Sequence, residues 1–122
     1  MPLPVSAPFH SSLMQPAAAR LRDLLAKVAL AAPRIELINN VDVREETEPV
    51  RIRDALVRQA ASPVRWVESI RRMAEKGVTH VVECGPGKVL AGLVRRIDGN
   101  LRGLALADRE SLEQTLATIR EA

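Results

Sequence analysis

Aromatic residues are almost absent from this 122-residue sequence: Phe9 and Trp66 are the only two rings, and there is no tyrosine. RNA-binding modules stack bases on aromatic side chains, so this scarcity argues against such a module. The 18 Lys and Arg residues and 15 Asp and Glu residues give a net charge of +3, and the two signs are interspersed. Without a basic arm, we expect no nucleic-acid partner.

Cysteine and histidine are also scarce. Cys84 has no second cysteine for an internal disulfide, and His10 and His80 are too few to complete a zinc site. No apolar run approaches the ~20 residues that cross a bilayer. The first residues lack the basic start and apolar core of a signal peptide. We therefore expect a cytoplasmic protein with no bound metal and no membrane contact.

The pattern of apolar residues predicts helices alternating with strands. A helical period recurs over 14–28, 52–60, 63–76, 89–97 and 110–122, and β-branched runs predict strands at 35–38, 78–84 and 101–106. This alternation predicts an α/β fold with a parallel sheet. Two or three strands are few for so many helices, because parallel strands are normally flanked on both sides. We therefore expect part of a larger sheet.

Local signals mark several helix ends. Ser12 and Gln15 have the spacing of a capping box. Ser62 before Pro63 predicts a helix N-terminus. Gly77 stands where a C-terminal glycine cap belongs.

The segment Gly85-Pro86-Gly87-Lys88 lies between a predicted strand and a predicted helix, where phosphate-binding loops occur. A dinucleotide fingerprint would need glycine in place of Leu90, and a P-loop would need it in place of Val82. Both nucleotide motifs therefore fail. A tight glycine turn is the favoured interpretation, and anion binding at the helix N-terminus is the alternative.

Two side chains have the chemistry of catalytic groups. Cys84 ends a predicted strand, where α/β proteins place reactive groups, but a lone cysteine is more often a small buried apolar residue. His10 precedes a predicted helix and has the chemistry of a general base, or else is a surface histidine. No Gly-x-Ser-x-Gly nucleophile elbow occurs in the sequence.

Five blocks of sequence occur in the order found in malonyl-CoA:acyl carrier protein transacylases of the bacterial fatty-acid-synthesis type, which the chain resembles over nearly its whole length. They are Pro4-Val5-Ser6-Ala7-Pro8-Phe9-His10-Ser11, Asn39-Asn40-Val41, Arg53-Asp54-Ala55-Leu56-Val57-Arg58-Gln59, Ser62-Pro63-Val64-Arg65-Trp66 and Glu83-Cys84-Gly85-Pro86-Gly87-Lys88-Val89-Leu90. Five blocks in one order are a far more specific signal than any single motif.

The resemblance implies a ping-pong transfer of malonyl from coenzyme A to the phosphopantetheine thiol of acyl carrier protein, with both thioesters as substrates and no cofactor. His10 resembles the family's catalytic base, which activates a serine. Gln59 resembles the residue whose backbone carbonyl holds that imidazole. Phe9 resembles the bulky neighbour that fills the space a branched extender unit needs in the substrate site.

The resemblance also implies a division of the chain and a missing part. Residues 1–10 resemble the last strand of a small ferredoxin-like subdomain and the return to the large domain, and residues 11–122 resemble the C-terminal part of the hydrolase-like large domain with its parallel sheet. The family's serine elbow, its malonyl-binding arginine and its oxyanion-hole glutamine loop would precede Met1. We therefore expect a C-terminal fragment or truncated chain, or else a split subunit, that is inactive alone and self-associates through its uncovered sheet.

A non-catalytic role is the second hypothesis. Carrier proteins are generally acidic, and a basic surface would steer one toward this chain. The same basic residues are also typical of a solvated helix face. They are Arg65, Arg71, Arg72, Lys76, Arg95 and Arg96.

Overall fold

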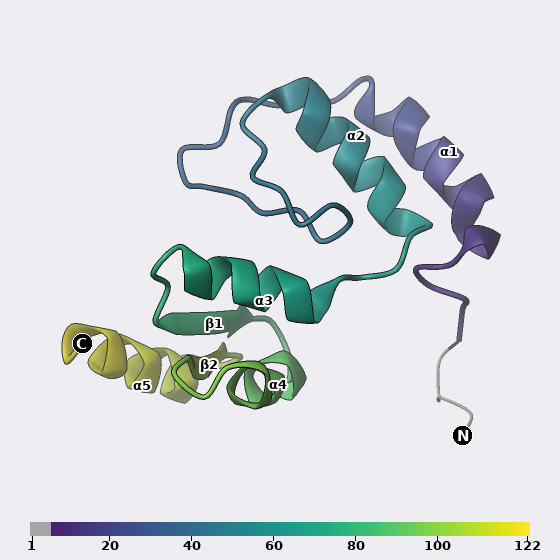
Figure 1. Cartoon of the computed structure of the whole chain (residues 1–122). Helices are drawn as coiled ribbons and strands as arrows, with labels where there is room; N and C mark the ends of the chain where they lie inside the picture. Colours follow the sequence, from purple (N-terminus) through teal and green to yellow (C-terminus); the bar gives the residue numbers. More distant parts are fainter. Residues whose placement is uncertain (1–5) are drawn as a thin grey trace. The chain divides into compact units, whose positions relative to one another are not determined.

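The computed structural model describes residues 6–122, in which one 3₁₀ helix, five α-helices and two strands occur. In chain order they are η1 (Ser12–Met14), α1 (Gln15–Leu25), α2 (Pro49–Ala60), α3 (Trp66–Glu75), β1 (His80–Cys84), α4 (Val89–Ile97), β2 (Arg102–Leu106) and α5 (Arg109–Arg120). The chain divides into two compact units, the first ending at Ser69 and the second comprising Ile70–Ala122 (Figure 1).

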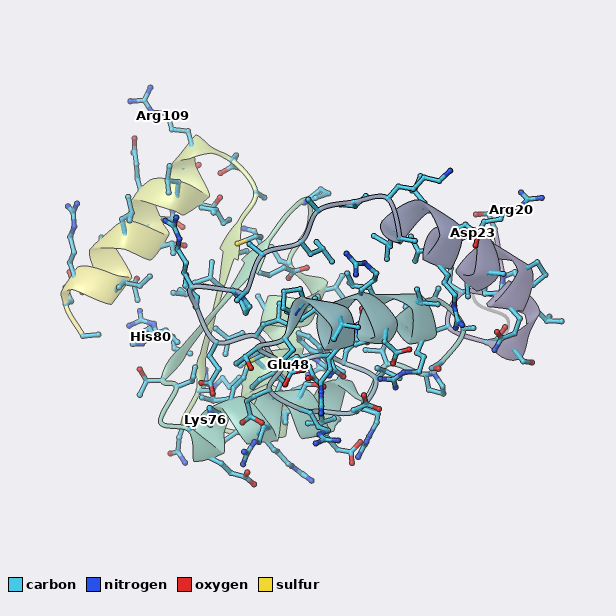
Figure 2. All side chains as sticks on the ribbon, turned by 90° about the horizontal axis from the view of Figure 1, so that it is seen from above. Arg20, Asp23, Glu48, Lys76, His80 and Arg109 are labelled. Atoms are coloured by element: carbon cyan, nitrogen blue, oxygen red, sulfur yellow. The ribbon has the colours of Figure 1, made fainter. Side chains whose placement is uncertain are left out.

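The first unit is built on α1 and α2, which lie side by side and run in opposite directions (Figure 1). Its buried apolar side chains are small, with Ala18, Ala55 and Val57 each less than 5% exposed. Charged side chains such as Arg20 and Asp23 extend from α1 into solvent (Figure 2). The first unit therefore gains little from apolar burial, and polar bonds carry more of its structure.

One such bond set joins the two helices. The Arg53 Nε on α2 donates to the Leu25 carbonyl over 2.8 Å, and its Nη2 donates to the Val28 carbonyl over 2.9 Å. Carbonyl groups at the end of a helix lack intrahelical partners. The Leu25 carbonyl also accepts from the Val28 N–H over 3.2 Å, and the added bonds from Arg53 tie the carboxyl end of α1 to the first half of α2.

The strand predicted at 35–38 is wrong. Only Ile38 pairs, through an isolated antiparallel bridge to Glu45, and Ile35 is 83% exposed. The bridge is closed by the turn between these two residues, with the Glu46 N–H donating to the Leu37 carbonyl over 3.0 Å. A β-branched run becomes a strand only where a partner strand is available, and no such partner lies beside this segment among residues 6–122.

Two predicted helix starts are also wrong. Ser12 begins the 3₁₀ helix rather than capping α1, and α1 begins at Gln15 with no side-chain cap. The start predicted at 62–63 moves to Trp66. The backbone before it is held instead by the Arg65 N–H, which donates over 3.0 Å to a carbonyl outside the helix.

The second unit contains the predicted parallel sheet. β1 and β2 pair in parallel with a register that runs from His80 opposite Arg102 to Cys84 opposite Leu106. α4 connects the strands and contacts both, and α5 contacts β2. The α/β class, with a parallel sheet and flanking helices, is therefore confirmed.

Close packing positions the helix against the sheet. A Cβ atom added to Gly103 on β2 would lie 2.2 Å from the Ala91 carbonyl oxygen on α4. No side chain fits in that space, so the glycine lets the helix backbone rest directly on the strand. Val94 on the same helix is fully buried.

Caps define the ends of the elements in the second unit. The predicted glycine cap at Gly77 is confirmed, since its φ is 85°. The Asp108 carboxylate accepts from the Ser111 N–H over 2.8 Å, and the Ser111 hydroxyl accepts from the Asp108 N–H over 2.9 Å, which forms a capping box. The hydrogen bond from the Ser111 N–H to the carboxylate is the largest cause that holds the pKa of Asp108 below its ordinary value. Arg109 then extends from α5 into solvent (Figure 2).

Between residues 6 and 122, no helix has both the length and the apolar character needed to cross a membrane. The same residues include no cluster of three or more His, Cys, Asp or Glu side chains suited to a metal ion. The leading strand implied for the segment that ends at residue 10 falls partly on residues 1–5, which lie outside the described range. Residues 6–9 form bends and the start of a turn.

Candidate functional site

His10 lies in the short turn that precedes η1. Its φ of 58° is in the left-handed region, which few residues other than glycine adopt. The Ser11 hydroxyl donates to the Pro8 carbonyl over 2.7 Å, and the Met14 N–H donates to the Ser11 carbonyl over 3.0 Å. Local bonds therefore hold the backbone of the turn, while His10 itself is exposed to solvent.

The His10 ring is held from α2. Its Nδ1 lies 2.9 Å from the backbone carbonyl oxygen of Gln59, the next-to-last residue of that helix. In a continuing helix this carbonyl would accept the N–H of residue 63, but Pro63 has none. The Gln59 carbonyl is therefore left available for a side chain that arrives from elsewhere in the first unit.

This hydrogen bond fixes the chemistry of the imidazole. A carbonyl oxygen only accepts, so the Nδ1 of His10 carries the hydrogen and donates it to Gln59. In the neutral ring, Nε2 then bears the free lone pair. An exposed Nε2 that can accept a proton, on a ring oriented through its other nitrogen, is the arrangement a general base requires.

The other predicted side chain, Phe9, is adjacent to His10 in sequence and is 60% exposed. The nearest serine in sequence, Ser11, is engaged with the Pro8 carbonyl. The structure thus brings His10 and Gln59 together, whereas it shows no contact that assigns a role to Phe9.

An ion-pair network that the sequence analysis missed adjoins Gln59. The Arg58 Nη1 and Nη2 donate to the two carboxylate oxygens of Asp42 over 2.8 and 2.6 Å, and its Nε donates to Asp54 over 2.7 Å. The hydrogen bonds from Arg58 lower the pKa of Asp42, and those to Asp42 and Asp54 raise the pKa of Arg58. The helical spacing of Asp54 and Arg58 is visible in sequence, but nothing local points to Asp42.

The backbone of residues 85–88 agrees with the favoured interpretation of this segment as a tight glycine turn. Gly85 and Gly87 have φ values of 145° and 100°, which glycine alone adopts readily. The Glu83 carboxylate accepts from the Ala91 N–H over 2.9 Å, in the first turn of α4. A carboxylate of the chain thus already takes one of the N–H groups that an anion would use at this helix end.

Cys84 differs from the expectation of a buried apolar residue, because it is exposed at the end of β1. Its Sγ lies 3.9 Å from the Val82 carbonyl oxygen, a weak contact. The strand ends at Cys84, and burial there would need a cover that residues 70–122 do not supply.

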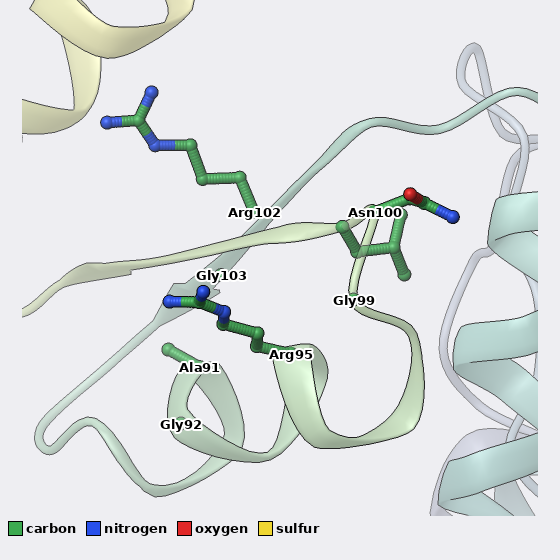
Figure 3. Close-up of a pocket in the computed structure, with 8 residues that line it drawn as sticks. Ala91, Gly92, Arg95, Gly99, Asn100, Arg102 and Gly103 are labelled. Atoms are coloured by element: carbon green, nitrogen blue, oxygen red, sulfur yellow. The ribbon is translucent and has the colours of Figure 1, made fainter.

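An open depression of about 540 Å³ lies between α4 and β2 (Figure 3). Arg95 and Arg102 both line it, and neither forms an ion pair with another residue in the range 6–122. Glycines at 92, 99 and 103 make up much of the remaining wall. The depression is therefore positively charged and accessible.

No family model matches the chain. Among curated proteins, it is 49% identical over 116 residues to the malonyl CoA-acyl carrier protein transacylase of Salmonella typhimurium. This match covers 95% of this chain and 38% of that protein. It is 41% identical over 121 residues to the transacylase of the same description from Bacillus subtilis, covering 99% of this chain and 38% of that protein.

Solved structures give the same result. The acyl-carrier-protein S-malonyltransferase of Burkholderia pseudomallei 1710b is 60% identical, with a TM-score of 0.89, and the match covers 96% of this chain and 38% of that one. A second match, with a TM-score of 0.90 and 43% identity over 97% of this chain and 38% of the other, is a malonyl-transacylase in complex with a type II PKS acyl-carrier protein. The chain spans a little over a third of the length of the relatives it matches, and over that span it belongs to the malonyl CoA-acyl carrier protein transacylase family.

Proposed function

We propose that this chain takes part in malonyl transfer from coenzyme A to acyl carrier protein, with His10 as general base and the Gln59 carbonyl as the group that orients it. The main observation that supports this proposal is the 2.9 Å hydrogen bond from His10 Nδ1 to the Gln59 carbonyl oxygen. It leaves Nε2 available at an exposed position, and it uses a neutral acceptor where many serine hydrolases use a carboxylate.

In the proposed reaction a serine hydroxyl supplied by a nucleophile elbow attacks the malonyl thioester. His10 Nε2 takes the hydroxyl proton as the oxygen–carbon bond forms, and it returns that proton to the coenzyme A thiolate as the carbon–sulfur bond breaks. In the second half, Nε2 takes the proton of the phosphopantetheine thiol as its sulfur bonds to the malonyl carbonyl carbon, and it returns that proton to the serine oxygen as the ester carbon–oxygen bond breaks. No serine of this sequence stands in such an elbow, so the purified chain alone should release no coenzyme A above background.

Supplying the missing elbow tests this function. The part of the Salmonella typhimurium transacylase that the chain does not match would be co-expressed with this chain, and coenzyme A release measured. We expect transfer from the pair, and a loss of at least about 100-fold when His10 is replaced by alanine. A His80→Ala variant is the control, because His80 lies on β1. Full activity in the His10→Ala pair would refute the assignment of the base.

Phe9 has a narrower proposed role as the neighbour that restricts the acyl site. In the same pair, Phe9→Ala should raise the rate with methylmalonyl-CoA relative to malonyl-CoA, because truncation removes bulk. An unchanged ratio would argue against this role.

A carrier-protein-binding role without catalysis is the second candidate. The observation in its favour is positive charge that no acidic side chain neutralises. Within the described residues, no ion pair is formed by Arg71, Arg95 or Arg96, whereas Arg65 pairs with Glu68. Binding of acyl carrier protein to the isolated chain, weakened by salt and by Arg95→Glu, would support it. Salt-independent binding would contradict it.

The assembly and setting of the chain follow from the same proposal. We expect residues 1–10 to end a ferredoxin-like subdomain and 11–122 to form part of a hydrolase-like large domain in the cytoplasm. Large apolar side chains are exposed in each unit, and such surface favours self-association of the isolated chain. They include Leu13, Leu24 and Ile35 in the first unit and Val89, Leu112 and Ile119 in the second. Light scattering that shows only monomer at high concentration would contradict this expectation.

A further inference from the structure

The turn from Asn39 to Asp42 is unusually well fixed for a surface loop. Asn39 is 2% exposed, and its Oδ1 accepts from the Val41 N–H over 3.2 Å and from the Asp42 N–H over 2.7 Å. Its Nδ2 donates to the Arg44 carbonyl over 3.3 Å. The β-branched residue Val43 has a φ of 56°, a costly conformation that persists only where the surroundings impose it.

This turn holds the chain on both sides of Gln59. Before it, Arg58 forms the two parallel hydrogen bonds to Asp42, over 2.8 and 2.6 Å. After it, the Arg65 N–H donates to the Asn40 carbonyl over 3.0 Å. Paired bonds between a guanidinium and a carboxylate fix direction as well as distance. The chain is therefore tied to this turn at two points, Arg58 on α2 and Arg65 after it, which lie on either side of Gln59.

We propose that Asp42 and Arg58 are positioning residues, which hold the Gln59 carbonyl in the direction that selects the Nδ1–H form of His10. The inference rests on the proposed role of His10 as base, and it adds the reason why that ring keeps one tautomer. Arg58 has a second carboxylate partner, Asp54, but that residue is on α2 itself and ties the helix to nothing else. Of the two carboxylate partners of Arg58, only Asp42 belongs to the turn, so only this ion pair connects Arg58 to it.

The test reads the ring directly in the full 122-residue chain. Two-bond ¹H–¹⁵N correlation spectra, recorded at about pH 9 and so well above the reference histidine pKa of about 6.5, separate the Nδ1–H and Nε2–H tautomers. A His80→Gln variant assigns the two histidines, and the His80 signals then serve as an internal reference. We expect the unchanged chain to show His10 mainly as Nδ1–H.

Asp42→Asn and Asp54→Asn are a matched pair, since each removes one carboxylate from Arg58. We expect Asp42→Asn to shift His10 toward Nε2–H and Asp54→Asn to leave it unchanged. An unchanged ring in a folded Asp42→Asn chain would overturn the proposal, as would equal shifts in both variants or a native His10 without the Nδ1–H form.

Far-UV circular dichroism checks that each variant folds. If Asp42→Asn loses helix, Arg58→Lys is measured instead, because it keeps the charge but not the two parallel bonds, and the same shift is expected. If both variants unfold, the ion pair between Asp42 and Arg58 serves folding only, and the proposal is wrong. The tautomer is read without turnover, so an active His10→Ala pair in the transfer assay would disprove the proposed base and leave this result standing.

Discussion

Each of the two compact units is stabilised internally by a different kind of interaction. In the first, hydrogen bonds and ion pairs join segments far apart in sequence: His10 reaches Gln59 across 49 positions, Arg53 reaches Leu25 across 28, and Arg58 reaches Asp42 across 16. In the second unit, a parallel backbone ladder and close helix–strand packing are the main connections.

The difference shows what a catalytic base needs from its surroundings. Apolar packing supplies free energy but little direction, whereas a hydrogen bond or a paired ion contact fixes the orientation of a group. The candidate base lies in the unit that is rich in directional bonds. We expect substitutions at packed positions of the second unit to change stability strongly, and those at the directional bonds of the first to change orientation and pH response with smaller losses.

The largest effect is expected for Gly103→Ala in the second unit. The new Cβ would meet the Ala91 carbonyl at 2.2 Å, and helix backbone cannot rotate away as a side chain would. We expect a loss of about 3 kcal/mol in the free energy of unfolding, measured by urea denaturation. Gly92→Ala is the control on α4, because no atom lies within 4 Å of its added Cβ. A neutral Gly103→Ala would mean that packing against β2 is looser than described.

Val94→Ala should be the next most damaging. Val94 is fully buried on α4, and truncation removes two methyl groups from the core of the second unit. We expect a loss of about 2 kcal/mol. Val89→Ala on the same helix, at a position 73% exposed, should change stability by about 0.5 kcal/mol or less. Equal losses at both positions would remove the contrast between a packed and an exposed face.

Asp42→Asn in the first unit should cost about 1 kcal/mol or less near neutral pH, because the ion pair is partly exposed. Its pH dependence is more informative. Arg58 lowers the pKa of Asp42 below 3.8 in the folded chain. The ion pair therefore contributes its full stabilisation of the fold above the unfolded-state pKa, and this contribution is lost as the pH falls through the lower folded-state pKa. Unfolding curves should therefore converge for the native chain and Asp42→Asn at acid pH. A constant difference down to about pH 2 would contradict this linkage.

The smallest effect is expected where an ion pair joins no separate segments. Arg109 and Glu113 lie one turn apart on α5, and the Arg109 side chain is 91% exposed. We expect Arg109→Ala to change stability by about 0.5 kcal/mol or less, by the same urea measurement. A loss larger than that of Asp42→Asn would contradict the expectation that ion pairs between residues distant in sequence contribute more than pairs within one helix.

Some local predictions from the sequence were confirmed and others failed for a common reason. The strand that ends at Cys84, the glycine turn after it and the helix from Val89 were found as predicted, because adjacent residues carry all their signals. The strand at 35–38 failed because pairing depends on a neighbour that the pattern does not reveal. The start of α3 moved because a backbone bond outside the helix holds Arg65.

The candidate site divides in the same way. His10 and Gln59 were predicted from family-like blocks, and the sequence also shows why the Gln59 carbonyl is free, since Pro63 stands four residues later. Asp42 was not predicted, although it forms two hydrogen bonds with Arg58, one of them the shortest that this guanidinium makes, at 2.6 Å. Nothing in its sequence neighbourhood distinguishes it from other acidic loop residues.

The sequence by itself predicted the helices and strands of the second unit, indicated the family, and pointed to His10 and Gln59 as candidate site residues. Each of these depends on residue order or on contacts a few positions apart. Tertiary structure alone decided which nitrogen of His10 carries the hydrogen, which carboxylate holds Arg58 and why Gly103 must lack a side chain. Those features depend on directions and distances between remote segments, and such geometry exists only once the chain has folded.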